Sequence, residues 1–368
     1  MTSLAKTPLW ERHQAAGARM VPFAGYSMPV QYEGLMDEHH AVRRAAGIFD
    51  VSHMAEVELR GPDAAALADH LTPSRLSTLE PGRVVYSCLT TERGTFVDDI
   101  LAYRLEAERF LFVVNATNRA KDVAWIEDHA TRFNATVEDV SDRTALIAFQ
   151  GPLARGIVAS LASGFDAKSV KYYHVAQGLV AGRRVLASRT GYTGEQGFEI
   201  FCEPEDAPHL WDALLDAGRA DGVQPAGLGA RDSLRLEAAL PLYGNDIDDT
   251  TTVLEAALEF VIDWEKRGFI GREALDAQRA RGPSRRRVGF EVVDRGIARH
   301  GHGVFVRDEH VGHVSSGTFS PTLEKAIGMA YVPASMAAAG TEFEIDVRGK
   351  RLRAITIPMP FYKRPKST

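Results

Sequence analysis

Apolar residues recur along the chain with two different periods, which divide it into predicted helices and strands. After a loop-like piece at 22–29, near-helical spacing in Glu38–Ala46 predicts a helix, which Gly47 can terminate. Runs rich in Val, Ile, Phe and Tyr at 84–90, 96–105 and 110–115 predict strands. Because short polar joints separate these three runs, we expect an antiparallel meander.

Later segments alternate in type and then become uniformly strand-like. Helices are expected at 151–161, 207–218 and 228–240, and a strand at 180–189. Past residue 288 the strand-like runs are 288–293, 304–307, 326–331, 342–347 and 352–357. They predict a C-terminal β-barrel or sandwich. Since no regular β-α-β alternation is present, an α+β fold is favoured, with residues 1–282 as one α+β region and 283–368 as the C-terminal domain.

Composition narrows the functional classes. A net charge of −6 argues against a general nucleic-acid binder, and the one basic run, Arg279–Arg287, is expected to be a solvated linker. The sequence contains no run of about 18 apolar residues, the length needed to cross a bilayer. The first ten residues lack the apolar core of a secretory signal. Cys88 and Cys202 are far apart in sequence and are expected to stay reduced, which favours a cytoplasmic protein. Together with the charge and the missing apolar run, neither nucleic acid nor a membrane is expected as a partner.

Several common catalytic motifs are missing from the sequence. It contains no phosphate-binding loop of the Gly-x-x-x-x-Gly-Lys-Ser/Thr type and no Gly-x-Gly-x-x-Gly. Neither His-Glu-x-x-His nor Cys-x-x-Cys occurs, so no metal is expected.

The pair Asp98–Asp99 is the most informative feature, because both carboxylates lie inside an apolar predicted strand. Acidic residues are depleted from strands and rarely buried without a partner. Alternation places Asp99 on the face of Tyr103, and Asp98 on the opposite face. One carboxylate could cap a turn or pair with an arginine. We expect at least one to address a ligand, and Asp99 is the better candidate because its face also carries an aromatic ring with a polar tip.

Two further segments admit both a structural and a functional interpretation. Glycines at 191, 194 and 197 permit tight turns in Arg189–Glu199, although a plain glycine-rich hairpin would look the same. The segment Gly227–Glu237 reads as a helix with charges of alternating sign, which is often only a solvated face. These features indicate a pocket with aromatic walls, a carboxylate and an arginine for an anionic group.

In addition, the chain resembles the T-protein (aminomethyltransferase) family of the glycine cleavage system over nearly its whole length. The motifs that carry the resemblance are 7–10, 22–29, 37–43, 49–54, 97–100, 189–199, 227–246, 269–274 and 316–322, in the family's order. The resemblance implies a three-lobed folate-binding fold with a C-terminal β-barrel. It also implies transfer of a one-carbon unit from an aminomethyl group on lipoylated H-protein to tetrahydrofolate, which releases ammonia and forms 5,10-methylenetetrahydrofolate.

The same resemblance implies roles for individual residues. Asp99 matches the family's essential aspartate, expected to favour the cationic state that forms as ammonia leaves. Glu199 matches the carboxylate that takes the amino edge of the pterin, and Arg231 a folate-contacting arginine. The remaining matches to folate-binding positions are Met54, Tyr86, Tyr103, Asn115, Tyr173 and Tyr192.

Two alternatives stay open at this point. A folate-dependent demethylase of the same fold would have a similar pocket but a small methylated donor. A non-catalytic folate-binding factor of the iron–sulfur maintenance type would carry a Lys-Gly-Cys-Tyr/Phe-x-Gly-Gln-Glu signature, and Arg231–Glu237 stands in its place.

Overall fold

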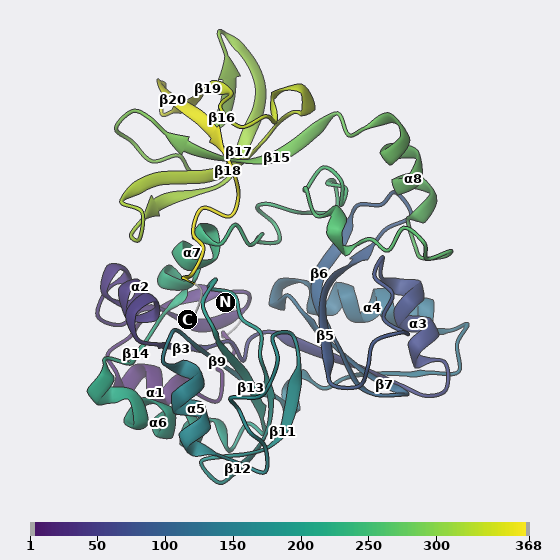
Figure 1. The fold of residues 1–368 in the computed structure, drawn as a ribbon, viewed down its shortest axis with the longest axis vertical. Coiled ribbons are helices and arrows are strands. Elements are labelled where there is room, and N and C mark those ends of the chain that lie inside the picture. Colours follow the sequence, from purple (N-terminus) through teal and green to yellow (C-terminus); the bar gives the residue numbers. More distant parts are fainter. Residues whose placement is uncertain (1–3, 366–368) are drawn as a thin grey trace. The chain divides into compact units, whose positions relative to one another are not determined.

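The computed structural model describes residues 4–365, which form two compact units built from separated stretches of chain (Figure 1). The first unit contains residues 4–71, 75–87 and 100–232. The second contains 72–74, 88–99 and 233–365. Two strands and one helix continue from one unit into the other. The boundary expected at residue 282 stays a prediction.

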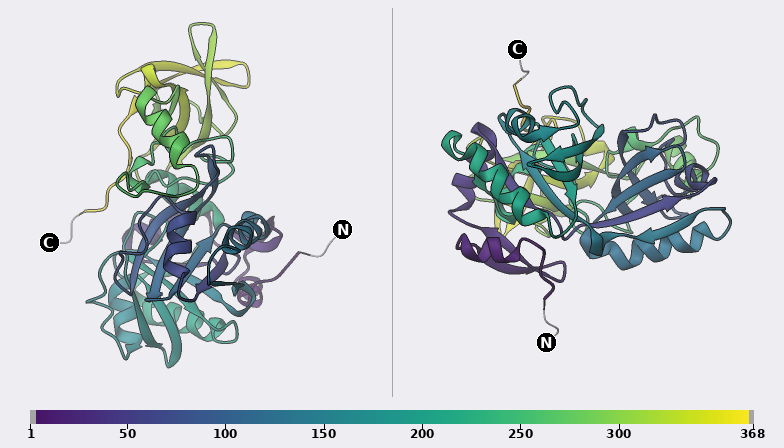
Figure 2. Two further views of the ribbon diagram at one scale, coloured as in Figure 1. Left: turned by 90° about the vertical axis from the view of Figure 1, so that its right-hand side faces the viewer. Right: turned by 90° about the horizontal axis from the view of Figure 1, so that it is seen from below.

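The first unit contains a seven-stranded sheet in the order β10-β11-β12-β13-β9-β3-β14. Its strands are β3 (Gly47–Asp50), β9 (Ala145–Gln150), β10 (Ala162–Ser163), β11 (Val175–Val180), β12 (Arg183–Ser188), β13 (Gly197–Cys202) and β14 (Gln224–Pro225). Helices α5 (Ala154–Leu161) and α6 (Ala207–Gly218) pack against it and against each other (Figure 2). Phe149, Phe198 and Trp211 belong to the apolar core that this packing buries.

The strand expected at 180–189 is confirmed as β12, which begins three residues later than expected. It pairs with β11, which the sequence did not predict, in a hairpin whose turn is Ala181–Gly182. Both turn residues have positive φ, 47° and 77°. That conformation is typical of two-residue hairpin turns.

A five-stranded sheet follows the order β5-β6-β7-β4-β8. Its strands are β4 (Ala55–Arg60), β5 (Arg83–Thr90), β6 (Phe96–Glu106), β7 (Arg109–Val114) and β8 (Thr136–Asp139). The adjacency of β5, β6 and β7 agrees with the expected meander. Helix α3 (Ala64–Leu71) contacts β4 and β7, while α4 (Arg119–Ala130) contacts β8 and α3.

The chain begins with a helix and a hairpin. Helix α1 (Trp10–Ala15) precedes β1 (Arg19–Phe23) and β2 (Tyr26–Gln31), and α2 (Leu35–Arg44) follows. The expectation of a loop at 22–29 is therefore wrong, because a two-stranded ribbon occupies that range. Its prolines, Pro22 and Pro29, masked the strand signal, although proline is tolerated in strands that lie at the edge of a sheet.

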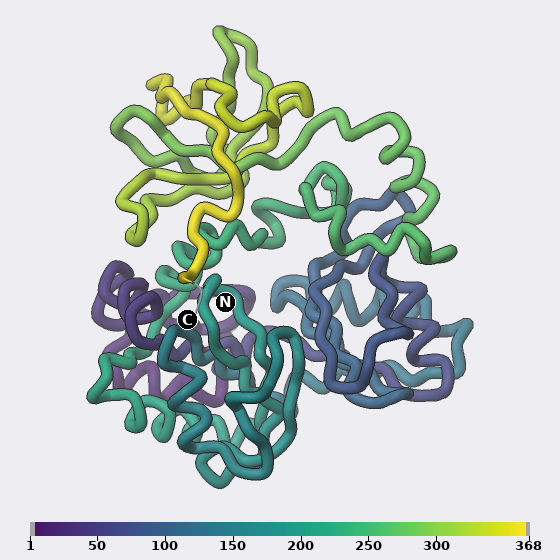
Figure 3. The backbone as a smooth tube through the Cα atoms, in the orientation of Figure 1, coloured from purple at the N-terminus to yellow at the C-terminus, as the bar shows by residue number. Residues whose placement is uncertain are grey.

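The second unit contains a closed barrel in the order β15-β18-β17-β16-β19-β20. Figure 1 labels its strands, and Figure 3 traces the course of the backbone through it. Its strands are β15 (Arg285–Val292), β16 (Gly303–Val306), β17 (Glu309–Ser320), β18 (Lys325–Pro333), β19 (Glu342–Val347) and β20 (Lys350–Ile357). A barrel, and not a sandwich, thus closes the chain. Its longest strand, β17, escaped prediction because glycine, serine and histidine dominate its sequence.

The basic run Arg279–Arg287 is a solvated linker only in part, because residues 279–282 and 284 are exposed but most of the run belongs to regular elements. Its first part ends helix α8 (Arg272–Arg281), and its last part begins β15. Arg287 is only 3% exposed.

Buried polar contacts attach helix α7 (Leu228–Glu237) to the barrel within the second unit. Arg235 Nη1 lies 2.7 Å from Asp246 Oδ2, which also accepts the hydroxyl of Ser316 at 2.8 Å. The hydroxyls of Ser320 and Thr322 both donate to the carboxylate of Glu237. The motif 316–322 therefore provides polar groups that hold the C-terminal half of α7 against the barrel.

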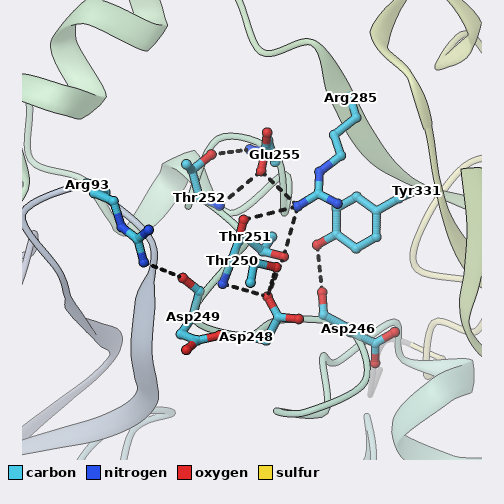
Figure 4. A network of polar contacts seen from close by, with 10 residues as sticks. All are labelled: Arg93, Asp246, Asp248, Asp249, Thr250, Thr251, Thr252, Glu255, Arg285 and Tyr331. Atoms are coloured by element: carbon cyan, nitrogen blue, oxygen red, sulfur yellow. Dashed lines mark hydrogen bonds and ion pairs between the residues drawn. The ribbon is translucent and has the colours of Figure 1, made fainter.

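A neighbouring network organises the loop that follows α7 (Figure 4). Asp248 Oδ1 accepts the backbone N–H of Thr250 and the hydroxyls of Thr250 and Thr251. Arg285 donates to Glu255 at 3.3 Å, and its guanidinium lies over the ring of Tyr331. The Tyr331 hydroxyl in turn donates to the Asp246 carbonyl at 2.6 Å. These contacts fix the loop against β15 and β18.

Candidate functional site

Glu199 occupies the middle of β13, where the residue is 7% exposed. The cross-strand register pairs it with Ser188 on β12, and the Thr190 hydroxyl donates to it. Burial raises the pKa of Glu199 above its ordinary value, which the Thr190 hydrogen bond and the charge of Arg231 partly oppose. A buried carboxylate with one such donor keeps acceptor capacity for a ligand with paired N–H groups.

The glycine-rich segment before Glu199 is shaped by one buried amide. Gln150 at the end of β9 donates to the carbonyls of Thr190 and Phe198 at 3.1 and 3.2 Å, and accepts the hydroxyl of Thr193. A Cβ at Gly191 would overlap the Gln150 amide, and one at Gly197 would overlap the Phe149 carbonyl. The glycines are therefore required by close packing around Glu199, which a plain hairpin does not explain.

Two tyrosines lie near the Glu199 carboxylate. Tyr103 on β6 is fully buried, packs edge-on to Phe201 at 5.5 Å, and has a hydroxyl with no hydrogen-bond partner of standard geometry. Burial raises the pKa of Tyr103, and the charge of Glu199 adds to the effect. Burial also raises the pKa of Tyr173, with smaller contributions from Tyr172 and Glu199. Both phenols therefore stay protonated and can donate.

Tyr173 is held in an unusual backbone conformation. Its φ is +57°, while its N–H bonds the Arg189 carbonyl at 3.1 Å and its carbonyl accepts the Val84 N–H at 2.9 Å. A tyrosine in the left-handed region is uncommon, and such strain is concentrated at functional sites. Tyr173, which the sequence named as a folate-binding position, thus lies within electrostatic reach of Glu199.

Arg231 stands in the first turn of α7, and its guanidinium lies 4.5 Å above the ring of Tyr192. This cation–π contact orients the arginine. Its charge lowers the pKa of both Glu199 and His53, so that Arg231 acts electrostatically on the carboxylate and on the imidazole.

Met54 ends a tightly bonded loop between β3 and β4. Its N–H bonds the Val51 carbonyl at 3.0 Å, and Asp50 Oδ1 accepts the Ser52 N–H at 2.9 Å. Asp50 Oδ2 also accepts Thr7 and lies 2.8 Å from His13 Nε2. Burial opposes the charged form, yet these hydrogen bonds hold the pKa of Asp50 below its ordinary value. The loop base is therefore rigid.

Tyr86 and Asn115 are placed by strands of the five-stranded sheet. Tyr86 is half-buried on β5, two residues beyond the Val84 N–H that bonds Tyr173. Asn115 directly follows β7, with extended φ and ψ of −68° and 136°. Their contact with folate stays a prediction.

The two aspartates of β6 belong to the second unit and differ in burial. Asp98 is fully buried, whereas Asp99 is half-buried. Burial and the nearby charges of Asp99 and Asp98 raise the pKa of the Cys88 thiol well above its ordinary value. The more accessible carboxylate is thus the one that the sequence favoured, although its catalytic role stays a prediction.

Comparison with known proteins gives one consistent result. Residues 9–266 match the family described as the GCVT N-terminal domain, and residues 285–363 match the glycine cleavage T-protein C-terminal barrel domain. The chain belongs to the glycine cleavage T-protein family. This confirms the resemblance, the α+β fold with its C-terminal barrel, and the enzyme class, an aminomethyltransferase.

Individual relatives agree with this family membership over their full length. An aminomethyltransferase from Desulfitobacterium hafniense is 47% identical, covering 99% of this chain and 100% of its own. One from Symbiobacterium thermophilum is 49% identical, covering 99% and 98%. The crystal structure of glycine cleavage system aminomethyltransferase T from Bartonella henselae has a TM-score of 0.92 at 36% identity, covering 98% and 99%.

Within this T-protein family member, the sequence did not predict every residue of the site. Gln150 and Thr190 shape the surroundings of Glu199, and His53 lies beside Arg231. His53 could have been found from its motif, 49–54. Gln150 could not, because it acts through backbone carbonyls that only the folded sheet brings together.

Among residues 4–365, no group of three or more His, Cys, Asp or Glu side chains is placed to hold a metal ion. Across the same part of the chain, no helix is long and apolar enough to cross a membrane.

Proposed function

We propose that this protein transfers the one-carbon unit of an aminomethyl group, carried on the lipoyl arm of H-protein, to tetrahydrofolate. The observation that carries the proposal is the buried Glu199 carboxylate, with Arg231 and Tyr192 beside it. The products are ammonia, 5,10-methylenetetrahydrofolate and the dihydrolipoyl carrier. In this reaction two folate nitrogens replace the amine nitrogen and the lipoyl sulfur on the transferred carbon.

Each side chain of the Glu199 cluster has a chemical task in this proposal. Glu199 accepts the paired N–H groups of the pterin amino edge, a planar donor set suited to two carboxylate oxygens. Tyr103, Tyr173 and Tyr192 provide aromatic surface for flat rings. Arg231 neutralises an anionic group of the ligand. Met54, Tyr86 and Asn115 complete the expected wall around the pterin and benzoyl rings.

Asp99 is the proposed catalytic residue. As ammonia departs, the transferred carbon becomes part of a cationic iminium-like group, and a fixed carboxylate stabilises that charge most strongly where it develops. The half-burial of Asp99 suits this task, because the carboxylate is accessible to a ligand while partly shielded from water. Asp98, fully buried, suits a structural role.

The matched pair of variants tests this assignment. Asp99→Asn should lower the rate of ammonia release by about 10²–10³, because one preorganised electrostatic contact is lost. Asp98→Asn should lower the melting temperature but leave the rate per folded molecule nearly unchanged. Activity and thermal unfolding are measured on both proteins. An inactive Asp98→Asn beside an active Asp99→Asn would show that the roles are reversed.

Three finer expectations belong to the same proposal. The reaction needs no metal, since the folate nitrogens act as nucleophiles and the carrier sulfur as leaving group. The carrier is lipoylated H-protein, and nucleic acid and membrane are not partners. A cytoplasmic location is supported by the two buried free cysteines, Cys88 and Cys202.

A further inference from the structure

His53 lies in the loop between β3 and β4, and the reaction proposed above gives it no task. Its side chain is buried, with the residue 4% exposed, and its Nδ1 has no hydrogen-bond partner. Nearly all buried polar atoms in proteins are paired, because leaving one unpaired destabilises the fold. Leucine or phenylalanine would fill similar space without that cost. The imidazole therefore requires another explanation.

Holding the loop is not that explanation. The residues on either side make the loop's own hydrogen bonds: Asp50 accepts the Ser52 N–H, and Met54 donates to Val51. The Ser52 hydroxyl donates to the Leu146 carbonyl at 3.2 Å and lies 3.1 Å from the Leu146 N–H, which donates to it. These contacts fix the backbone on both sides of His53, and none of them involves its ring.

The surroundings of the ring point to binding and not to proton transfer. Phe23 meets the imidazole edge-on at 5.4 Å. Burial and the charge of Arg231 lower the pKa of His53 to about 4, against a smaller opposing effect of Asp50. The imidazole is thus neutral near pH 7, with one nitrogen as donor and the other as acceptor. A group with that pKa is a poor general acid or base at neutral pH.

We propose that His53 is a further folate-binding residue, whose neutral imidazole hydrogen-bonds a polar group of the bound ligand. Its neighbours carry the inference. Met54 follows it in the same rigid loop, and Arg231, the arginine beside Glu199, is close enough to act on it electrostatically. The inference rests on the proposed function, because it names another contact to the same ligand.

Four variants test this proposal by tetrahydrofolate titration under anaerobic conditions, together with thermal unfolding. In His53→Asn the amide takes the place of Nδ1, while His53→Leu and His53→Phe are two independent apolar replacements. Glu199→Gln is the control for loss of a proposed contact. We expect both apolar variants to bind tetrahydrofolate about tenfold more weakly, the equivalent of one hydrogen bond, without a lower melting temperature. His53→Asn should bind within about threefold of the wild type.

Three results would overturn parts of this account in distinguishable ways. If the wild type binds folate and a folded apolar variant binds it equally well, His53 is not a ligand contact. If Asn, Leu and Phe all weaken binding alike and all lower the melting temperature, the ring only packs the loop. If the wild type itself binds no folate, the proposed function fails, and the role of His53 fails with it.

Discussion

At the scale of single residues, the site depends on charged groups that are buried beside a partner. Glu199 has one hydroxyl donor and a nearby guanidinium, and Asp50 has three donors. Desolvation opposes ionisation of both, yet only Asp50 has enough donors to hold its pKa below the ordinary value. Glu199 is therefore left short of hydrogen bonds, which is the state expected of a group that completes its contacts with a ligand.

His53 gives the clearest pH prediction at this scale. Its pKa is about 4 in the folded chain and about 6.5 when unfolded. Between these values the unfolded chain binds a proton that the folded chain does not. The imidazole therefore has no pH-dependent effect on stability above pH 6.5, and it destabilises the fold progressively as the pH falls toward 4, to a limit of roughly 3 kcal/mol. Urea unfolding of wild type and His53→Leu at pH 7, 6 and 5 measures this effect.

The difference in unfolding free energy between the two proteins is the quantity to compare, because all other titratable groups are the same in both. Wild type should lose more unfolding free energy than His53→Leu as the pH falls. A difference that stays constant from pH 7 to 5 would mean that the imidazole titrates normally, and so is not buried beside Arg231.

At the scale of elements, the glycine-rich segment and the end of β9 form one unit around Glu199. Gln150 bonds carbonyls on both sides of the turn, and the glycines leave room for its amide. The sequence predicted the turn but not its partner, because the spacing of glycines shows where the backbone is flexible and not what approaches it.

A pair of glycine substitutions tests this element. Gly191→Ala should destabilise the fold by about 1–3 kcal/mol, because the new methyl group displaces the Gln150 amide. It should weaken folate binding as well, since the same amide holds the turn before Glu199. Gly156→Ala is the matched control, since Gly156 lies within α5 with open space at its Cβ. That change should be neutral or stabilising by up to about 1 kcal/mol. Equal unfolding free energies for the two variants would contradict the account.

At the scale of the whole molecule, strongly patterned segments were predictable and weakly patterned ones were not. The runs that became β5, β6 and β7 combine β-branched and aromatic residues with clear alternation. By contrast, β17 is long but polar, and the ribbon at 19–31 carries two prolines. Tertiary pairing, which outweighs local propensity, decides such segments.

The site was predictable only in part for a related reason. Asp98–Asp99 stood out because carboxylates are rare within apolar strands, but the choice of Glu199 and Arg231 came from the family resemblance. Composition could not place 72–74 and 88–99 with the C-terminal third of the chain, as the structure does. Such long-range assembly depends on packing between segments that no local pattern connects.

The central claim is tested most directly by supplying H-protein whose lipoyl arm carries the aminomethyl group. With tetrahydrofolate and this enzyme, the account predicts equal amounts of ammonia and 5,10-methylenetetrahydrofolate. Carrier without a lipoyl group should give neither product, and prior treatment with a strong chelator should leave the rate unchanged. No ammonia from the loaded carrier, alongside turnover of a small methylated amine or sulfonium donor, would contradict the account and favour a folate-dependent demethylase.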